Sequence, residues 1–332
     1  MKKYNVALIG ATGMVGESLI SILQEREFPV NQLYPLASKR SLGKQVEFNS
    51  QSIEVIDLEE FNFNGIDFCF FSAGSKVSDQ YAPIAANAGA IVIDNTSRYR
   101  YEDDIPLIVP EVNSSFLKNY KKRNIIANPN CSTIQLMVAL APIHLHSPIK
   151  KINIATYQSV SGAGRSAVEL LNRQLTDVNY PEKYDNPLFA HNVIPQIGDI
   201  QDNGYTLEEM KLVWETKKIL GSDDIKVNAT AVRVPVRVGH AEAVTIETET
   251  KINLSLIKDL LSKAPNIKLF NDESYPMSIL HGEGTDQVFV GRIREDFSTK
   301  NSINLWIVAD NIRKGAALNS IQIAETIIKS YF

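Results

Sequence analysis

The chain has 332 residues, of which 44% are apolar and 22% are charged, and its formal net charge is -4. At roughly 100–200 residues per domain, this length predicts two globular domains. The chain has no basic excess to neutralise a phosphate backbone and no run of about 18 apolar residues to cross a membrane, so neither nucleic acid nor a membrane is expected as a partner.

The first hundred residues alternate strands with helices. The apolar run at residues 6–9 is too short for a signal peptide and is typical of a parallel strand covered on both faces. Further strands are expected at residues 33–37, 67–71 and 90–93, each followed by a turn and a helical stretch. This alternation predicts an α/β domain with a doubly wound, Rossmann-like parallel sheet.

A glycine-rich turn lies between the first strand and the next helix. Glycine there permits a tight turn and a close approach of the backbone to a pyrophosphate, which a helix N-terminus favours. The spacing alone is a weak signal, and the alternative is an ordinary turn between a strand and a helix. Its place directly after the first strand favours a dinucleotide site, with contacts from Gly10, Thr12, Gly13, Met14, Val15 and Gly16.

The end of the second strand should choose between NAD and NADP. An NAD site usually has a carboxylate there for the ribose 2′-hydroxyl, whereas this chain reads Ala37-Ser38-Lys39-Arg40-Ser41. A hydroxyl and two cations without an acid suit a 2′-phosphate, so NADP is the expected cofactor, held by Ser38 and Arg40. A solvated basic loop is the alternative, above all for Lys39.

Cys131 has the setting of a nucleophile. It follows the strand-like residues 124–127 and begins a helical stretch, and a cysteine at a helix N-terminus gains thiolate character from the helix dipole. The usual alternative for a free cysteine is a buried core position, which we expect for Cys69 inside an apolar strand. The polar turn Asn128-Pro129-Asn130 argues against it for Cys131. Two cysteines are too few for a disulfide framework and favour a reducing cytoplasm.

The pattern changes after about residue 150. Longer strands with alternating apolar and polar residues are expected at residues 151–157, 226–238 and 243–252. Alternation predicts a largely antiparallel sheet, hence an α+β domain, with one face open to a partner. Arg233 lies on the middle strand and His240 follows at a turn, so both are expected on one hairpin. An amphipathic helix is expected to end the chain.

A thiolate mechanism also needs an acid/base group, and histidine suits neutral pH. The chain has five histidines. His144 and His146 fall at the end of the Cys131 helix, where the dipole favours a cation, and are expected to be structural. His191 and His281 have loop-like surroundings that decide nothing, which leaves His240 as the favoured residue.

Several segments follow one another as they do in a known enzyme family. They are Asn128-Pro129-Asn130-Cys131-Ser132-Thr133, residues 157–164 with Gln158, residues 233–240, and the shorter runs 94–97, 109–113, 289–294 and 315–319. Over nearly its whole length the chain thereby resembles the bacterial form of aspartate-β-semialdehyde dehydrogenase. The resemblance implies an NADP-binding domain of residues 1–130 with 313–332, and a catalytic and dimerisation domain of residues 131–312. No metal site is expected.

The activity implied by the resemblance is the reversible, NADPH-dependent reductive dephosphorylation of 4-phospho-L-aspartate to L-aspartate 4-semialdehyde and inorganic phosphate. This step serves lysine, methionine, threonine and diaminopimelate biosynthesis. Cys131 would form a thioester, His240 would act as acid/base, and Gln158 would orient the substrate. Asn130 and the backbone N–H of Cys131 would stabilise the oxyanion.

The resemblance also implies a set of binding residues. Arg233 would bind the substrate carboxylate, Glu208 its ammonium, and Arg100 with Lys211 its phosphate. Further cofactor contacts are implied for Ser72, Gly74, Ser161, Gly162 and Asn319. Relatives more often have a small or aromatic residue in place of Arg98, so either Arg98 or Arg100 is the phosphate ligand.

The residues themselves support part of this set. Residues 206–209 form a capping box that engages Glu209. Glu208 and Lys211 share a helix face at i, i+3, and a solvated surface ion pair is the alternative for them.

Two other functions stay open from the sequence. An N-acetyl-γ-glutamyl-phosphate reductase would share the chemistry but has no use for a carboxylate facing a free ammonium. A non-catalytic nucleotide-binding paralogue should have lost the nucleophile or its acid/base partner, and this chain has both. A homodimer is expected because the open sheet face would otherwise lie exposed.

Overall fold

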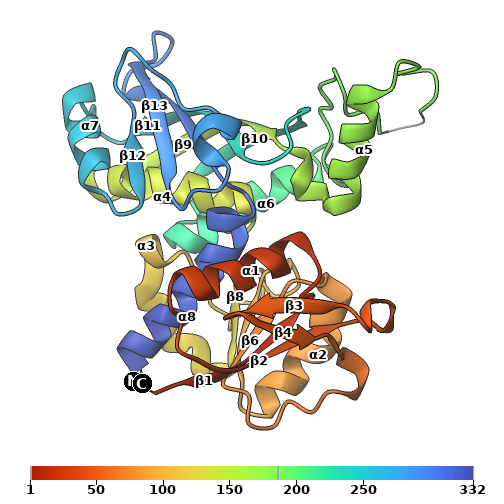
Figure 1. The fold of residues 1–332 in the computed structure, drawn as a ribbon. Coiled ribbons are helices and arrows are strands. Elements are labelled where there is room, and N and C mark those ends of the chain that lie inside the picture. The colour runs from red at the N-terminus through yellow and green to blue at the C-terminus, as the bar shows by residue number, and fades with distance from the viewer. Residues whose placement is uncertain (1, 185–186, 332) are drawn as a thin grey trace. The chain divides into compact units, whose positions relative to one another are not determined.

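The computed structural model describes residues 2–184 and 187–331. The chain forms two compact units (Figure 1): unit 1 is Met1–Asn130 with Ala316–Phe332, and unit 2 is Cys131–Gly315. The chain therefore leaves unit 1 directly before Cys131 and returns to it with its last helix.

Unit 1 is built on a parallel sheet with the strand order β5-β2-β1-β6-β7-β8. Its strands are β1 (Tyr4–Ile9), β2 (Val30–Ala37), β5 (Ile56–Asp57), β6 (Phe68–Phe71), β7 (Ile91–Asp94) and β8 (Ile125–Ala127), and a separate antiparallel hairpin is formed by β3 (Gln45–Phe48) and β4 (Gln51–Glu54). This is the strand order of dinucleotide-binding sheets. Successive strands are added on one side of β1 up to β5, and from β6 onward they are added on its other side. The doubly wound parallel sheet is confirmed.

Helices cover both faces of this sheet. They are α1 (Met14–Glu25), α2 (Ser75–Asn87), α3 (Pro110–Asn113) and α8 (Leu318–Tyr331). In Figure 1, α1 and α8 lie on one side of the sheet and α2 on the other. One core joins Leu8 and Phe70 of the sheet to Leu23 of α1 and Ile321 of α8, which explains why the strands are apolar without alternation. The terminal amphipathic helix is confirmed and begins at Leu318.

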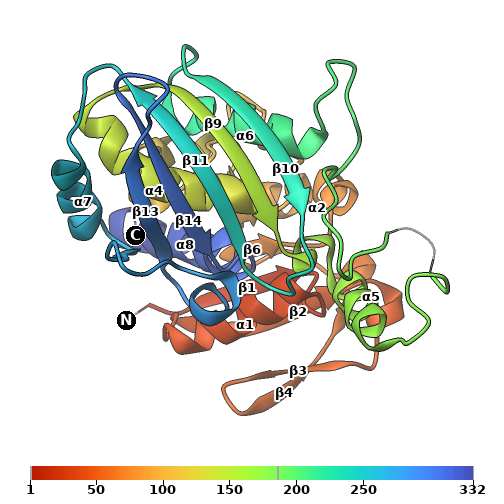
Figure 2. The same ribbon diagram turned by 90° about the horizontal axis from the view of Figure 1, so that it is seen from above.

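Unit 2 is built on a mixed sheet with the strand order β10-β9-β11-β14-β13-β12. Its elements are α4 (Cys131–His146), β9 (Ile149–Gln158), α5 (Arg165–Thr176), α6 (Leu207–Leu220), β10 (Lys226–Arg233), β11 (His240–Thr248), α7 (Leu254–Lys263), β12 (Ile267–Leu269), β13 (Val288–Glu295) and β14 (Ser302–Ala309). Figure 2 looks onto the sheet with α4 and α6 behind it. Within the described residues, no helix has the length and apolar character needed to cross a membrane.

The predicted hairpin of Arg233 and His240 is wrong. β10 ends at Arg233 and pairs in parallel with β9, while β11 pairs antiparallel with the other edge of β9. Residues 234–239 are therefore a connection that passes the end of β9, although their valines continue the alternation. The reason is the helix α6, because a strand that returns through a helical crossover adds to a sheet in parallel.

Candidate active site

Three of the predicted site residues form a row at one edge of the unit 2 sheet. Gln158 ends β9 and is paired with Arg233, which ends β10. Ala241 is paired with Tyr157, so His240, one residue earlier, lies beside Gln158. The side chains of Arg233, Gln158 and His240 are 8%, 1% and 0% exposed. Because successive side chains of a strand alternate between faces, this row lies on the face opposite Tyr157 and Ala241.

Cys131 begins α4 and is half-buried, as the sequence predicts. The next residue, Ser132, accepts a hydrogen bond of 2.5 Å from Nε2 of Gln158, which ties the start of α4 to the end of β9. Gly315 lies against the nucleophile, because a Cβ at that position would be 2.9 Å from Cβ of Cys131. Any side chain at 315 would displace the cysteine.

Glu208 lies inside this cluster and is only 7% exposed. Its Oε1 accepts a hydrogen bond of 3.1 Å from Gln158, and its Oε2 accepts one of 2.8 Å from Nζ of Lys211. The alternative of a solvated surface pair is therefore wrong for Glu208. The capping box is confirmed, since Thr206 and Glu209 bond each other's backbone N–H groups at the start of α6.

The charges of the cluster influence one another. Burial lowers the pKa of Arg233, and the negative charges of Glu208 and Cys131 oppose that change. Burial also lowers the pKa of His240, with a further contribution from the charge of Arg233, to about 3, although Glu208 and the Gly239 backbone act in the other direction. His240 is therefore neutral in the folded protein at neutral pH.

The two ring nitrogens of His240 have different surroundings. Nδ1 accepts a hydrogen bond of 3.1 Å from the backbone N–H of Ser159 and lies 3.0 Å from Oγ of the same serine. Nε2 is buried and has no hydrogen-bond partner among the described residues. Gly162 lies near Nε2, since a Cβ there would be 3.4 Å from Nε2 and 3.0 Å from a guanidinium nitrogen of Arg233.

Sequence reasoning missed two polar residues of this region, Ser159 and Asn311. Ser159 also accepts a hydrogen bond of 2.7 Å from Arg233 through its backbone oxygen. Asn311 follows β14 and accepts hydrogen bonds from the hydroxyls of Ser159 and Ser161. No motif marks Asn311; its position became apparent only because the end of β14 is paired with the start of β11.

The glycine turn of unit 1 fits a dinucleotide. Gly10 has a φ of +88°, and a Cβ there would lie 2.9 Å from Oγ of Ser72; a Cβ on Gly16 would lie 2.2 Å from the oxygen of Gly10. Side chains are therefore excluded where a ligand would approach the backbone. The first N–H groups of α1, on Met14 and Val15, have no acceptor within the helix and are free to face an anion.

Other predicted cofactor residues of unit 1 lie at the same edge of its sheet. Ser72 follows β6, and its hydroxyl donates to Ile9 at the end of β1. Gly74 has a φ of +96° and precedes α2. Thr12 Oγ1 lies 3.2 Å from Oγ of Ser41, which links the glycine turn to the loop after β2.

The two cations of the loop after β2, Lys39 and Arg40, differ in their ion pairs. Nζ of Lys39 lies 2.7 Å from Glu59 and 4.0 Å from Asp57, so its charge is already balanced. In the described part of the chain, Arg40 has no ion-pair partner. Ser38 precedes the short turn that contains both residues. The loop therefore offers a hydroxyl and the guanidinium of Arg40 to a 2′-phosphate.

The two candidate phosphate arginines also differ. Arg98 is bound to Asp79 at 2.5 Å and to Glu102 at 2.8 Å. Arg100 is 5% exposed and donates to the backbone oxygens of Asn128 and Asn95, each at 2.9 Å. Carboxylates thus occupy Arg98, whereas backbone groups fix the orientation of Arg100.

Asn130 and Asn319 are buried in unit 1, 6% and 0% exposed. The amide of Asn319 donates to Asn128 at 2.7 Å and to the backbone oxygen of Ile108 at 3.0 Å. It therefore braces the turn that leads to Cys131, and its contact with a cofactor stays a prediction. Asn130 directly precedes the nucleophile.

The remaining cysteine and the helix-end histidine belong to the core. Cys69 is fully buried in β6, and burial raises the pKa of its thiol well above the ordinary value, as expected for an inert cysteine. Nδ1 of His144 accepts the backbone N–H of Ile149 at 3.1 Å, and burial lowers its pKa. His144 therefore has the structural role that the sequence predicts. Its pKa is lowered, because the effect of burial is larger than that of the helix dipole, which would favour the protonated ring.

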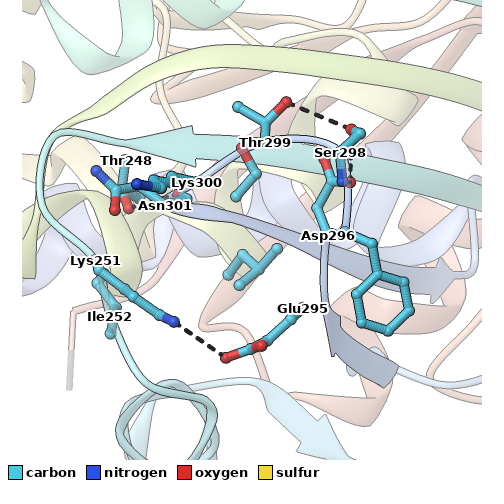
Figure 3. Close-up of a pocket in the computed structure, with 12 residues that line it drawn as sticks. Thr248, Lys251, Ile252, Glu295, Asp296, Ser298, Thr299, Lys300 and Asn301 are labelled. Atoms are coloured by element: carbon cyan, nitrogen blue, oxygen red, sulfur yellow. Dashed lines mark hydrogen bonds and ion pairs between the residues drawn. The ribbon is translucent and has the colours of Figure 1, made fainter.

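A separate pocket of about 540 Å³ lies at the opposite edge of the unit 2 sheet, between the ends of β11 and β13 (Figure 3). Lys251 lies 3.5 Å from Glu295, and the carboxylate of Asp296 accepts a hydrogen bond from the backbone N–H of Ser298. These groups are satisfied within the pocket. Among the described residues, no cluster of three or more His, Cys, Asp or Glu side chains is arranged to hold a metal ion.

Known proteins share both units. A family model described as "Semialdehyde dehydrogenase, NAD binding domain" matches residues 5–120, and one described as "Semialdehyde dehydrogenase, dimerisation domain" matches residues 140–314. A curated aspartate-semialdehyde dehydrogenase of Shewanella sp. (strain DB6705) is 51% identical over 337 residues, covering 100% of this chain and 99% of the relative.

Solved structures agree with these matches. Aspartate semialdehyde dehydrogenase II from Vibrio cholerae, complexed with ASA, has a TM-score of 0.98 and 50% identity, with 100% of both chains covered. An aspartate semialdehyde dehydrogenase with NADP from Candida albicans has a TM-score of 0.77 and 25% identity, with 98% of this chain and 99% of that chain covered.

The buried, neutral state of His240 predicts an acid-sensitive unit 2. The unfolded chain binds a proton on this histidine near pH 6.5, whereas the folded pKa is about 3, so stability from this group is lost as pH falls below about 6.5. Between pH 7 and pH 5 the loss should be about 2 kcal/mol. His240→Gln should therefore lose about 2 kcal/mol less stability over this interval than the native protein.

Tryptophan fluorescence during urea unfolding measures this difference, because Trp214 and Trp306 both lie in unit 2. His146→Gln, at an exposed position, is the matched control and should behave like the native chain. Equal losses in the native protein and His240→Gln would contradict the buried neutral state.

Proposed function

The chain belongs to the aspartate-semialdehyde dehydrogenase family, and from this premise we propose that it reversibly converts 4-phospho-L-aspartate and NADPH into L-aspartate 4-semialdehyde, inorganic phosphate and NADP. The observation that carries the proposal is the buried cluster of Gln158, Glu208, Arg233 and His240 beside Cys131. The reaction serves lysine, methionine, threonine and diaminopimelate biosynthesis. The relatives carry the same enzyme name.

The two parts of the chain have separate roles in this proposal. Residues 1–130 with 313–332 bind NADP, and residues 131–312 carry catalysis and dimerisation. The glycine turn, whose Gly10 and Gly16 leave no room for side chains, supports the first assignment. In the reaction the bound nicotinamide supplies the hydride.

Cys131 is the nucleophile of the proposed mechanism. Its Sγ attacks the acyl carbon of the phosphoanhydride, a C–S bond forms, and the C–O bond to phosphate breaks to give a thioester. Asn130 and the backbone N–H of Cys131 stabilise the oxyanion. After hydride addition the C–S bond breaks, and the aldehyde leaves. The Gln158 amide, bonded to Ser132 and Glu208, orients the substrate beside the sulfur.

His240 is the proton donor and acceptor of this mechanism. Hydride addition to the thioester yields an oxyanion that takes one proton from His240 to give the thiohemiacetal. His240 takes the same proton back when the C–S bond breaks to give the aldehyde and the Cys131 thiolate, and the reverse direction passes through the same two transfers. Nε2 is the ring nitrogen that the described chain leaves without a partner, and it faces the region of Arg233 and Gly162. The low pKa keeps the ring in its unprotonated form at neutral pH.

Two buried charged residues are proposed to recognise the two charged groups on the α-carbon of the substrate. Arg233 binds the α-carboxylate through its guanidinium fork, and Glu208 binds the ammonium group. Both carboxylate oxygens of the buried Glu208 have donors, Gln158 for Oε1 and Lys211 for Oε2. A carboxylate at this place suits a free amino group and is of no use to an N-acetylated substrate.

For phosphate we propose Arg100 in unit 1 and Lys211 in unit 2. The ion pairs of Arg98 with Asp79 and Glu102 favour Arg100 over Arg98. For the 2′-phosphate of NADP we propose Ser38 and Arg40, since Lys39 is bound to Glu59. Contacts by Thr12, Gly13, Met14, Val15, Ser72, Gly74, Ser161, Gly162 and Asn319 complete the proposed cofactor set.

We also propose that the chain works as a homodimer in the reducing cytoplasm. The open face of the unit 2 sheet has a hollow of about 850 Å³, and its lining includes Tyr157, Val234, Leu280 and Trp306. A large apolar hollow on an exposed sheet is typical of a surface that a partner covers. The match to a dimerisation domain supports a second copy as that partner.

The central test is phosphate-dependent reduction of NADP with L-aspartate 4-semialdehyde. We expect turnover by the native protein and none above background with Cys131→Ser, because a hydroxyl is a far weaker nucleophile than a thiolate. An inactive native protein would refute the proposed function.

Glu208→Gln should raise KM for the semialdehyde; an unchanged KM would favour an N-acetyl-γ-glutamyl-phosphate reductase.

The loop after β2 gives a matched pair of cofactor variants. Arg40→Ala should raise KM for NADPH about 10- to 100-fold, the effect of losing a hydrogen bond to a charged group, and should reduce the preference over NADH. Lys39→Ala should leave both values within about twofold, because Lys39 is bound to Glu59. Initial-rate kinetics with both cofactors measure the difference. A larger effect at Lys39 would reverse the assignment.

The two arginines give a second pair. Arg100→Leu should raise KM for inorganic phosphate at least tenfold, since it removes a charge-assisted contact. Arg98→Leu should change that KM little, because its charge is balanced by two carboxylates. KM for phosphate is measured in the semialdehyde oxidation assay. If Arg98→Leu has the larger effect on KM, Arg98 is the phosphate ligand.

The dimer surface is tested by a charge placed on it. Leu280 is 71% exposed on the hollow face, so Leu280→Asp should fold and shift sedimentation from dimer to monomer. Phe297→Asp is the control, because Phe297 is fully exposed at the other pocket. A native protein that sediments as a monomer would rule out the homodimer, and a dimeric Leu280→Asp would place the interface elsewhere.

A further inference from the structure

A chain of hydrogen bonds extends behind His240, away from its Nε2 atom. Ser159 Oγ lies 3.0 Å from Nδ1 of His240, and the Ser159 hydroxyl donates to Oδ1 of Asn311 at 3.0 Å. Ser159 is fully buried, and Asn311 is 4% exposed. Neither residue belongs to the substrate and proton-transfer roles of the proposed function.

Asn311 fixes this chain of bonds at its far end. Its Oδ1 also accepts from the Ser161 hydroxyl at 3.1 Å and from the backbone N–H of Gly239 at 2.9 Å. Gly239 directly precedes His240, and its φ of +89° with Ser278 close by leaves no room for a side chain. One amide oxygen therefore holds both the hydroxyl beside His240 and the backbone that leads into it.

The two Ser159 groups at Nδ1 act in opposite directions on the tautomer of His240. The backbone N–H, 3.1 Å away, only donates, so it favours a lone pair on Nδ1 and the hydrogen on Nε2. A ring in that tautomer cannot take up a proton at Nε2. The Ser159 hydroxyl both donates and accepts. When the hydroxyl donates its hydrogen bond to Asn311, its oxygen can accept a hydrogen bond from Nδ1–H of His240. The lone pair of the ring is then on Nε2.

We propose that Ser159 and Asn311 are positioning residues for His240, with the Ser159 hydroxyl, oriented by Asn311, accepting the Nδ1–H that His240 carries whenever Nε2 exchanges a proton with the reacting oxygen. The inference rests on the proposed role of His240. It adds a hydrogen-bond acceptor for Nδ1–H in both forms that the exchange uses, the neutral ring with its lone pair on Nε2 and the ring protonated at both nitrogens. Only the Nε2 proton is exchanged with the reacting oxygen, and the Nδ1–H stays in place on the Ser159 oxygen.

The charges around His240 explain why the relay ends in a neutral amide. Arg233 on β10 and burial disfavour the protonated ring, Glu208 on α6 favours it, and Cys131 on α4 lies within electrostatic range of Arg233. A carboxylate at position 311 would add a negative charge behind Nδ1 and hold His240 protonated at higher pH. The amide accepts the same hydrogen bonds without that charge.

The test uses the full-length protein and the pH profile of semialdehyde oxidation. Ser159→Ala and Asn311→Ala should lower kcat about 10- to 100-fold, a part of what acid–base catalysis contributes, while KM for the semialdehyde stays within about twofold. Ser159→Thr, which keeps the hydroxyl, should recover most of kcat. All variants at 159 keep the backbone N–H and the oxygen that binds Arg233.

Asn311→Asp is the variant that a merely structural role would not explain. The aspartate retains an acceptor for Ser159, Ser161 and Gly239 and loses only the hydrogen bond of 3.0 Å that Nδ2 of Asn311 donates to Ser161 Oγ, so we expect it to fold. We expect the acidic limb of the kcat/KM profile to move to higher pH by at least one unit, because the carboxylate stabilises the protonated ring. Ser159→Ala should move the limb the other way or only lower the plateau.

A buried serine elsewhere in unit 2 serves as the control. Ser147 is 1% exposed, and its hydroxyl lies 2.9 Å from that of Thr250 at the far end of α4. Ser147→Ala should leave kcat and the pH profile unchanged, even if it lowers Tm as much as Ser159→Ala does. Equal losses of kcat in the two serine variants would show a general effect of instability and overturn the proposal.

The experiments distinguish a failure of the proposed function from a failure of the Ser159–Asn311 relay. A native protein without activity refutes the proposed function, and a fully active His240→Gln refutes the role of His240. If His240→Gln is inactive but Ser159→Ala retains kcat within about twofold, or Asn311→Asp leaves the pH profile unchanged, the relay alone is wrong. Should Asn311→Ala fail to fold, Ser159→Ala and Asn311→Asp still decide the question.

Discussion

The position of β9 between two strands of opposite direction is the constraint on which the catalytic cluster depends. Because β10 runs parallel to β9 and β11 antiparallel to it, the end of β9 meets the end of β10 and the start of β11 at one edge. Gln158, Arg233 and His240 thereby become neighbours on one face. A slip of one residue in either pairing would turn one of these side chains to the opposite face, where the apolar hollow lies.

Burial of this polar row requires that each group be satisfied. Gln158 bridges the start of α4 and the start of α6 through Ser132 and Glu208, and Lys211 balances the Glu208 charge at 2.8 Å. Removing one partner of a buried ion pair costs about 3–5 kcal/mol. The same burial lowers the pKa of His240 to about 3. Burial therefore both makes these groups require hydrogen-bond partners and keeps the His240 ring unprotonated.

The proposed dinucleotide site of unit 1 depends more on the backbone than on side chains. Its glycine turn excludes side chains at Gly10 and Gly16 by contacts as short as 2.2 Å, so the local sequence indicates the site directly. The cation that we propose for a 2′-phosphate, Arg40, is less apparent from composition. Lys39 and Arg40 are adjacent in sequence, yet only Lys39 reaches the acids of β5 and the turn that follows, which belong to a segment some twenty residues further on.

Local features of the sequence determined the Rossmann-like sheet, the helix start at Cys131, the capping box of α6 and the buried core position of Cys69. Each depends on hydrophobic period, turn chemistry or helix-end physics within a few residues. Tertiary structure decided the rest. The sequence predicted a hairpin because valines alternate in the 234–238 connection as they do in a strand, but β9 lies between β10 and β11. Likewise, Ser159 lies 81 positions from His240 in the sequence, and Asn311 lies 72 positions from Gly239, whose backbone it binds. Pairing over such distances is set by sheet register and helix crossovers, for which no local pattern exists.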